Sequence, residues 1–152
     1  MNAMPARASG FTLVELVGVI AIAGILAAVA APRFFDTATF SSRGYSDAAA
    51  AFLRYAQKMS IARHGGVHVL IDSGGMTLCG VTTNPCPAAS LLPGPDGSQP
   101  FEVVVPDGVS QTGSAASISF DAQGRPDSGL VLNISGDPTR TLTLETETGY
   151  VY

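Results

Sequence analysis

The most prominent pattern in the chain is an apolar run close to its N-terminus. Residues 11–31 contain one charged side chain, Glu15. Residues 16–32 contain no charged residue and one proline, Pro32. At a rise of about 1.5 Å per residue, such a run spans about 30 Å, the hydrocarbon thickness of a bilayer. A helix satisfies its own backbone hydrogen bonds in lipid, so the pattern predicts a membrane-spanning helix over residues 11–32.

An amphipathic helical pattern follows over residues 33–66. Pro32, at the junction, is expected to bend the helix because proline lacks an amide donor. Residues 36–44 form a helix less readily, and a hinge or a break is predicted there. Gly65-Gly66 is expected to end the helix. Apolar side chains recur at three- and four-residue spacing and should pack against a sheet. They are Tyr45, Ala48, Ala49, Phe52, Ala56 and Met59.

Residues 67–152 change to short β-rich runs separated by turn residues. The first two runs, VHVLID and MTLCGV, should form a hairpin, and a variable loop rich in proline and glycine covers residues 82–100. Further strands are predicted at FEVVVP, ASISFD, GLVLNIS and RTLTLETE, with TGYVY as a final edge strand. A long N-terminal helix followed by antiparallel strands predicts an α+β fold in which one core packs on the helix.

Charge is sparse and acidic overall. The 152 residues carry a formal net charge of −4, and the eight basic side chains are scattered along the chain. This composition gives no general electrostatic attraction to nucleic acid, although a local patch of arginines stays open.

The two cysteines, Cys79 and Cys86, are too far apart in sequence for a CxxC redox or zinc motif, and no second pair completes a metal site. In an oxidising compartment they could close a short ring, which the chain-entropy relation values at roughly 2.5 kcal/mol. The alternative from the residues alone is two free thiols in a reducing compartment.

Catalytic and metal-binding patterns are not found in the sequence. His64 and His68 are separated by two glycines that interrupt a helix, and no third ligand is evident, so no metal site is predicted. Asp121 and Asp127 flank a turn and are expected to shape it. No phosphate-binding, dinucleotide-binding or hydrolase motif is present, so we predict neither a cofactor nor an enzyme.

The sequence from Gly10 onward, GFTLVE, resembles the processing signal of type IV pilins and of the pseudopilins of type II secretion. The resemblance implies that residues 1–10 are a leader cut off after Gly10 by a prepilin peptidase, which then N-methylates Phe11. It implies that the apolar helix is retained and that the fold is pilin-like. The competing interpretation is an ordinary signal peptide, with a mature protein that starts near Pro32.

Glu15 is costly in lipid, by about 2.5–3.5 kcal/mol at the centre of a bilayer and less near its surface. The resemblance implies a role in assembly, in which Glu15 faces the terminal amine of a neighbouring subunit. The alternative is that the carboxylate simply reaches the headgroups. Ala23, Ala27 and Ala31 lie at four-residue spacing, which allows close helix packing.

Within the family, SIARHGGVHVLID and SISFDAQGRP are similar to the H subunit class of minor pseudopilins and to minor pilins of type IV and mannose-sensitive haemagglutinin-type pili. This implies a single-pass protein of the bacterial inner membrane with a periplasmic C-terminal domain, which favours a Cys79–Cys86 disulfide. The implied partners are other pilin subunits, the prepilin peptidase and an inner-membrane assembly platform. A module that binds a surface or DNA through the 82–100 loop is the alternative.

Overall fold

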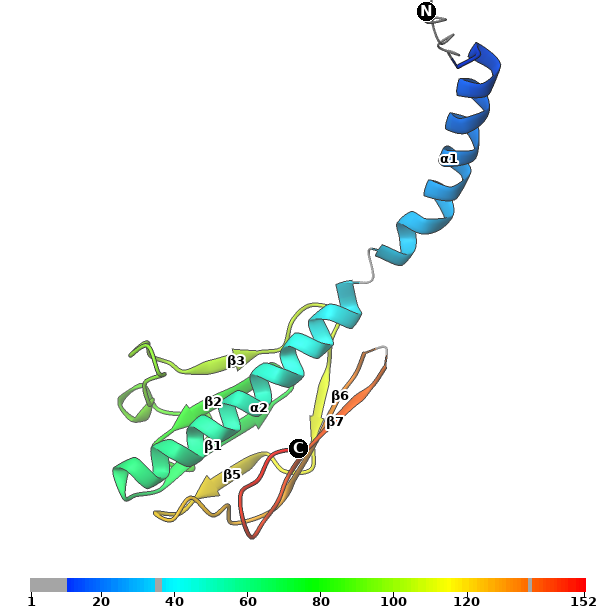
Figure 1. Cartoon of the computed structure of the whole chain (residues 1–152). Helices are drawn as coiled ribbons and strands as arrows, with labels where there is room; N and C mark the ends of the chain where they lie inside the picture. The colour runs from blue at the N-terminus through cyan, green and yellow to red at the C-terminus, as the bar shows by residue number, and fades with distance from the viewer. Residues whose placement is uncertain (1–10, 35–36, 137) are drawn as a thin grey trace, which may run out of the picture. The chain divides into compact units, whose positions relative to one another are not determined.

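A computed structural model of the chain describes residues 11–34, 37–136 and 138–152. The chain folds as two compact units, one that ends at Asp36 and one that begins at Thr37. The first unit contains helix α1 (Leu13–Phe34). The second contains helix α2 (Thr37–Arg63) and all of the strands (Figure 1).

Helix α1 presents apolar side chains to its surroundings on every side. Leu13 and Val14 are more than three-quarters exposed, and Ile22 and Ile25 further along are about two-thirds exposed. An apolar surface all round a helix indicates a segment that is buried against something outside its own chain. The helix includes Pro32 and ends two residues later, at Phe34. The bend expected at Pro32 stays a prediction.

Helix α2 runs without interruption from Thr37 to Arg63. The hinge or break expected over residues 36–44 is therefore wrong for residues 37–44, and Asp36 lies outside the described residues. Serine and glycine are poor helix formers, but packing overrides such weak preferences. Ser42 and Tyr45 in this stretch are only 1% and 4% exposed, so the domain holds the first turns in place.

The apolar stripe of α2 packs against strands of the β domain. Ala49, Phe52 and Ala56 are fully buried, as predicted. Ala48 is exposed, so its assignment to the stripe is wrong, and Leu53 is buried without having been predicted. Ala48 and Leu53 lie on opposite borders of the predicted stripe, so both differences mean that the buried face of α2 is turned towards Leu53.

Helix α2 ends one residue earlier than the glycines suggested. His64 adopts a left-handed conformation with φ of 51°. The N–H of His64 donates to the carbonyl of Ile61, and the N–H of Gly65 donates to the carbonyl of Ser60. This pair of bonds is a Schellman motif with histidine in the position that glycine usually takes.

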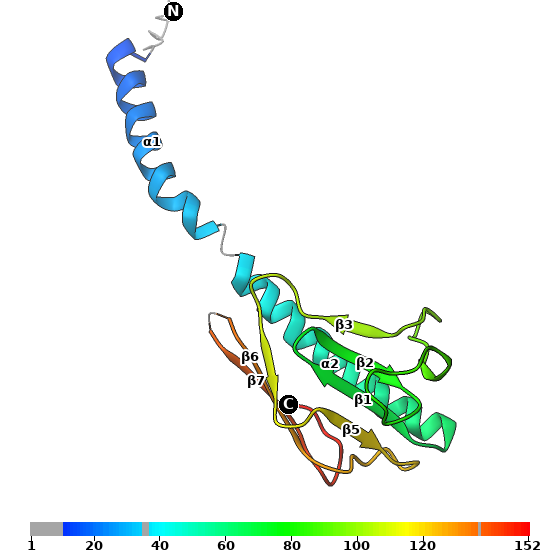
Figure 2. The same cartoon turned by 180° about the vertical axis from the view of Figure 1, so that it is seen from behind.

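The strands form two antiparallel sheets, which confirms the antiparallel β domain (Figure 2). The four-stranded sheet has the order β3-β2-β1-β5, and the three-stranded sheet has the order β4-β6-β7. Alternate residues of β1 and β6 face the core and are at most 5% exposed, as period-two alternation requires. The strands are β1 (Val67–Asp72), β2 (Gly75–Cys79), β3 (Glu102–Val104), β4 (Gln111–Gly113), β5 (Ser117–Phe120), β6 (Leu130–Ile134) and β7 (Arg140–Leu144).

Every predicted strand run contains an observed strand or bridge, and β1 pairs with β2 as the expected hairpin. The end of the chain also pairs as predicted. Thr143 and Tyr152 exchange both backbone hydrogen bonds, at 2.8 and 3.0 Å, so residues 150–152 extend the sheet beyond β7. Strand β4 was not predicted, because its three residues are polar or glycine.

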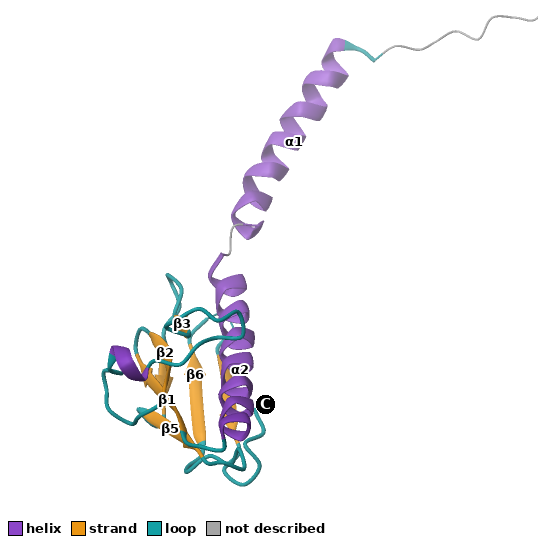
Figure 3. Ribbon diagram, turned by 90° about the vertical axis from the view of Figure 1, so that its left-hand side faces the viewer, coloured by secondary structure: helices purple, strands orange, loops and turns teal. Residues whose placement is uncertain are grey.

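The 82–100 loop is attached to the domain at several points. It contains a short 3₁₀ helix, Ala88–Ser90, on the side of the four-stranded sheet away from α2 (Figure 3). The N–H of Gly80 donates to the carbonyl of Ser90, and the N–H of Leu92 donates to that of Leu78. The Tyr55 hydroxyl donates to the carbonyl of Pro93 at 3.0 Å. The second half of this loop is therefore part of the packed domain.

A buried polar group connects α2 to both sheets. The Gln111 side chain, 7% exposed, accepts a 2.5 Å hydrogen bond from the Tyr45 hydroxyl. Its amide nitrogen donates to the carbonyl oxygens of Asp72 and Gly75, at 2.6 and 2.8 Å. Both carbonyls flank the β1–β2 turn, so one side chain satisfies three groups from three other elements, α2, β1 and β2. Fully satisfied buried polar groups of this kind help to specify a single packing arrangement.

Candidate processing and assembly site

The start of α1 carries the residues that the sequence assigns to processing. Gly10 and the rest of the 1–10 leader lie outside the described residues. Phe11 is 78% exposed. Thr12 caps the helix, because its side-chain oxygen accepts a 3.2 Å hydrogen bond from the N–H of Glu15. Its carbonyl accepts the first helical hydrogen bond, from the N–H of Leu16.

Thr12 and Glu15 form the Thr-x-x-Glu pattern that is typical of a helix N-terminus, and its Thr12 half is observed as the cap. Its side chain is exposed in the first turn of α1. An acidic residue is favourable there, since the helix dipole places partial positive charge at the N-terminus. The helix dipole gives Glu15 a reason to be present that is separate from pairing with a neighbouring subunit.

The small residues expected to allow close helix packing lie on α1. Ala23 and Ala27 are exposed, and the side chain of Ala31 lies outside those described. Within the described part of the chain, no helix combines the length and the apolar character that a membrane crossing requires. The membrane span over residues 11–32 stays a prediction.

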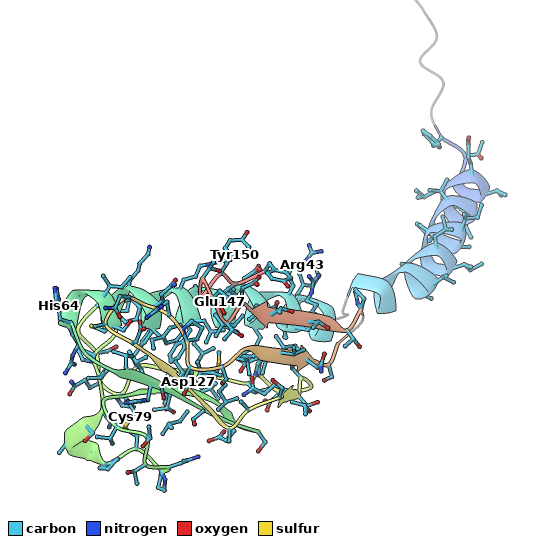
Figure 4. The ribbon with its side chains drawn as sticks, turned by 90° about the horizontal axis from the view of Figure 1, so that it is seen from below. Arg43, His64, Cys79, Asp127, Glu147 and Tyr150 are labelled. Atoms are coloured by element: carbon cyan, nitrogen blue, oxygen red, sulfur yellow. A yellow bond between two sulfur atoms is a disulfide. The ribbon has the colours of Figure 1, made fainter. Side chains whose placement is uncertain are left out.

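Cys79 and Cys86 form a disulfide, so the free-thiol alternative is wrong for this structure. Cys79 ends β2 and is fully buried, whereas Cys86 belongs to the exposed first half of the 82–100 loop. In Figure 4, Cys79 lies on the side of the domain away from α2. The bond therefore attaches the loop to the sheet at the end of a central strand. Closing so short a ring stabilises the fold by about 2.5 kcal/mol in the chain-entropy picture.

The two histidines do not come together as ligands. His64 ends α2, and the Nδ1 atom of His68 lies 2.8 Å from the Ser119 hydroxyl oxygen on the neighbouring strand β5. Burial lowers the pKa of His68, and the negative charge of Asp127 acts weakly in the opposite direction. Among the described residues there is no cluster of three or more metal-ligating side chains.

The two aspartates around QGRP shape their turn, as predicted. The Asp121 carboxylate accepts hydrogen bonds from the backbone N–H groups of Gln123 and Arg125, at 2.9 and 2.8 Å. These bonds lower the pKa of Asp121. Asp127 accepts from the backbone N–H of Ser119 at 3.1 Å. Both carboxylates are thus occupied by backbone donors of the turn.

A known protein family matches the N-terminal segment of the chain. Residues 5–31 match the family described as the prokaryotic N-terminal methylation motif. A 61-residue segment is 44% identical to the type IV narrow pilus major component PilA5 of Thermus thermophilus, covering 40% of this chain and 53% of that protein. The match thus spans about half the length of the curated relative. It is a match to a structural subunit, and the prediction that this chain is not an enzyme is confirmed.

The fold is similar to that of the type IV minor pilin FimU of Pseudomonas aeruginosa, in two crystal forms. The TM-scores are 0.57 and 0.56, with 14% and 15% identity. Each comparison covers 72% of this chain, and 85% and 90% of the FimU chains. Identity at this level shows the fold alone. The chain thus carries the methylation motif at its N-terminus, is similar in part of its sequence to a type IV pilus component, and has the fold of a minor pilin.

Proposed function

We propose that this chain is a subunit of a type IV pilus, cleaved between Gly10 and Phe11 by a prepilin peptidase and N-methylated at Phe11. The match to the methylation motif carries the proposal, because residues 5–31 include the bond to be cut. The pilus is favoured over a secretion pseudopilus because both relatives are named as type IV pilus proteins.

Before assembly, residues 11–32 hold the subunit in the inner membrane with the β domain in the periplasm. The apolar surface of α1 supports this placement, since it is exposed on all sides within its own unit. In the filament the same surface packs against the α1 helices of other subunits, where Ala23 and Ala27 allow close approach. The disulfide fits an oxidising compartment.

Changing Gly10 to alanine is expected to abolish cleavage in cells that contain a prepilin peptidase, because an added methyl group enters the substrate position beside the cut. Mass spectrometry of the N-terminus is the measurement. The wild-type chain should begin with methylated Phe11, and Gly10→Ala should keep the leader. Ser9→Ala, one residue further from the bond, is the matched control and should be cut normally.

A mature wild-type chain that starts near Pro32 would instead establish an ordinary signal peptide. Normal shortening of Gly10→Ala would remove Gly10 from the cleavage site.

Substitution of Glu15 tests the proposed charge pairing with a neighbouring subunit separately from the capping of α1. Glu15→Gln keeps the size of the side chain and removes the charge, whereas the Thr12 cap depends only on the backbone N–H of residue 15. We expect Glu15→Gln to be inserted and cleaved normally and to enter sheared filaments at least about tenfold less, the effect of about 1.4 kcal/mol.

Thr12→Ser keeps a capping hydroxyl and is the control, with incorporation expected at the wild-type level. If Glu15→Gln assembles as well as the wild type, charge pairing plays no part in assembly and the helix dipole alone explains Glu15.

A further inference from the structure

Charge is segregated between α2 and the rest of the second unit. Helix α2 carries four basic residues and one acidic residue, Asp47, whereas residues 64–152 carry nine acidic residues and two basic ones. The basic residues of α2 are Arg43, Arg54, Lys58 and Arg63. A subunit with one basic side and an acidic remainder is complementary to another copy of itself in a head-to-tail arrangement.

A groove of about 660 Å³ lies between α2 and the start of β7. Asp47 and Arg54 line it from α2, Thr139 and Arg140 from the other side, and Tyr152 from the end of the chain. Among the described side chains that line the groove, two carry a guanidinium group and one a carboxylate, which is an excess of positive charge. The groove therefore suits a ligand that brings a carboxylate.

The guanidinium group of Arg140 is not fully hydrogen-bonded within the described part of its own chain. Side chains two residues apart in a strand lie on the same face, so Arg140 lies on the same face of β7 as the buried Leu142 and Leu144. Its Nε atom is buried and finds no acceptor among the described residues. The described part of the chain contains one ion pair, Arg125 with Asp121, so Arg140 has no acidic partner there. A buried donor without a partner costs about 1–3 kcal/mol.

Arg54 contributes a second donor to the same groove. One of its Nη atoms donates to the carbonyl oxygen of Val151 at 3.0 Å, which fixes the guanidinium beside the groove. The side chain itself is exposed and makes no ion pair with a described residue. Fixing one end of a planar guanidinium leaves its remaining N–H groups oriented for a carboxylate at low entropic cost.

Four carboxylates of the domain accept hydrogen bonds within their own chain. Asp72 accepts from the N–H groups of Gly74 and Gly75, and Asp96 accepts from Ser98. Asp121 and Asp127 hold their turn, as described above. The other described carboxylates of the unit are exposed and accept no such bond: Asp47, Glu102, Asp107, Glu145 and Glu147. Asp47 already lines the groove, whereas Glu102 lies on β3.

The position of Glu102 would also allow it to reach the groove of a neighbouring copy. Strands β3 and β7 lie on opposite sides of α2 in both views (Figures 1 and 2). Strand β3 is an edge strand, and Val104, on the same face as Glu102, is 65% exposed. Tyr150 and Tyr152, both 63% exposed with ring centroids 5.9 Å apart, lie beside the groove and offer an apolar surface.

We propose that Glu102 on the β3 edge of one copy docks into the groove of the next copy, with its carboxylate on Arg54 and Arg140. Val104 then packs against the pair of exposed tyrosines. Because donor and acceptor surfaces lie on opposite sides, the contact is heterologous and propagates along an array without closing into a dimer. This inference rests on the proposed role in a filament and assigns a contact between its globular domains.

The test measures how much of the full-length chain enters sheared filaments relative to the amount in membranes, in cells that assemble the pilus. Arg140→Glu and Glu102→Arg should each lower this ratio about tenfold, because like charges then face each other. The double variant R140E/E102R should return to within about twofold of the wild type, since the pair is restored with its charges exchanged.

Two further variants keep the test independent of folding defects. Thr139→Glu places an acid on the exposed rim of the groove, leaves Arg140 in place, and should also lower the ratio about tenfold. Lys58→Glu makes the same change of charge as Arg140→Glu, on α2 but outside the groove, and should assemble normally.

Normal incorporation of Glu102→Arg or Thr139→Glu, or no recovery in the double variant, would overturn the contact while leaving the proposed function in place. A wild-type chain that is not cleaved at Phe11, or that never enters filaments, would instead refute the proposed function.

Discussion

Replacing Gly75 with alanine is expected to destabilise the β domain by more than about 4 kcal/mol, among the largest effects of a single substitution. Gly75 begins β2 with φ of 153°, which side-chain-bearing residues rarely adopt. A Cβ atom there would overlap the carbonyl oxygen of Val103 on the paired strand β3. Backbone cannot rotate away as a side chain can, so β3 would have to leave the sheet. Denaturant unfolding of the full chain in detergent, followed by circular dichroism, measures the loss.

Gly108→Ala separates steric overlap from backbone strain. Gly108 also has a positive φ, of 78°, but an added Cβ would meet no heavy atom within 4 Å. Only the strain of the left-handed conformation remains, about 1–2 kcal/mol. Equal losses for the two variants would show that contact with β3 does not determine the requirement for glycine at position 75.

Replacing Gln111 with leucine is expected to cost about 3–5 kcal/mol, in spite of the similar volume of the two side chains. The change leaves the Tyr45 hydroxyl without its acceptor and the carbonyls of Asp72 and Gly75 without their common donor, in a region with little access to water. The same unfolding measurement applies. Thr112→Ala, at an exposed neighbour on β4, is the control and should change stability by less than about 0.5 kcal/mol.

The same hydrogen-bonded group gives a second measure in alkaline solution. Burial, with a smaller contribution from the charge of Asp72, raises the pKa of Tyr45 from 10.0 to about 12. The folded state therefore holds this proton more tightly than the unfolded state. Its contribution to stability is complete below pH 10 and is lost as the pH rises towards about 12. Tyr45→Phe should remove this part of the pH dependence, and an unchanged alkaline slope would contradict the assignment.

Long-period patterns made the overall architecture predictable from the sequence. The apolar run, the amphipathic stripe and the change to alternating strands at Gly66 each extend over many residues, so single exceptions do not mask them. The hairpin of β1 and β2 was predictable too, because turn residues separate two alternating runs. The prepilin-type motif at Gly10 and Phe11 was recognised from its own residues.

Features that depend on distant contacts could not be predicted in the same way. Strand β4 contains no apolar residue, and its place in the sheet depends on Gln111 reaching Tyr45 and the β1–β2 turn. The first turns of α2 have poor helix propensity and are helical because Ser42 and Tyr45 are buried. Arg140 faces the core side of β7, beside α2, an arrangement that neither segment indicates by itself. The Thr12 cap is different, since its Thr-x-x-Glu signal was present in the sequence.

The position of Thr12 has a consequence for maturation of the subunit. The cap and the first helical hydrogen bond come entirely from residues on the C-terminal side of the Gly10–Phe11 bond. Within residues 11–34, which the structure describes, α1 already has these capping partners, so the helix is expected to keep its first turn if the leader is released. If the chain is cleaved as we propose, the mature N-terminus would therefore begin only one residue before the residue that already caps the helix.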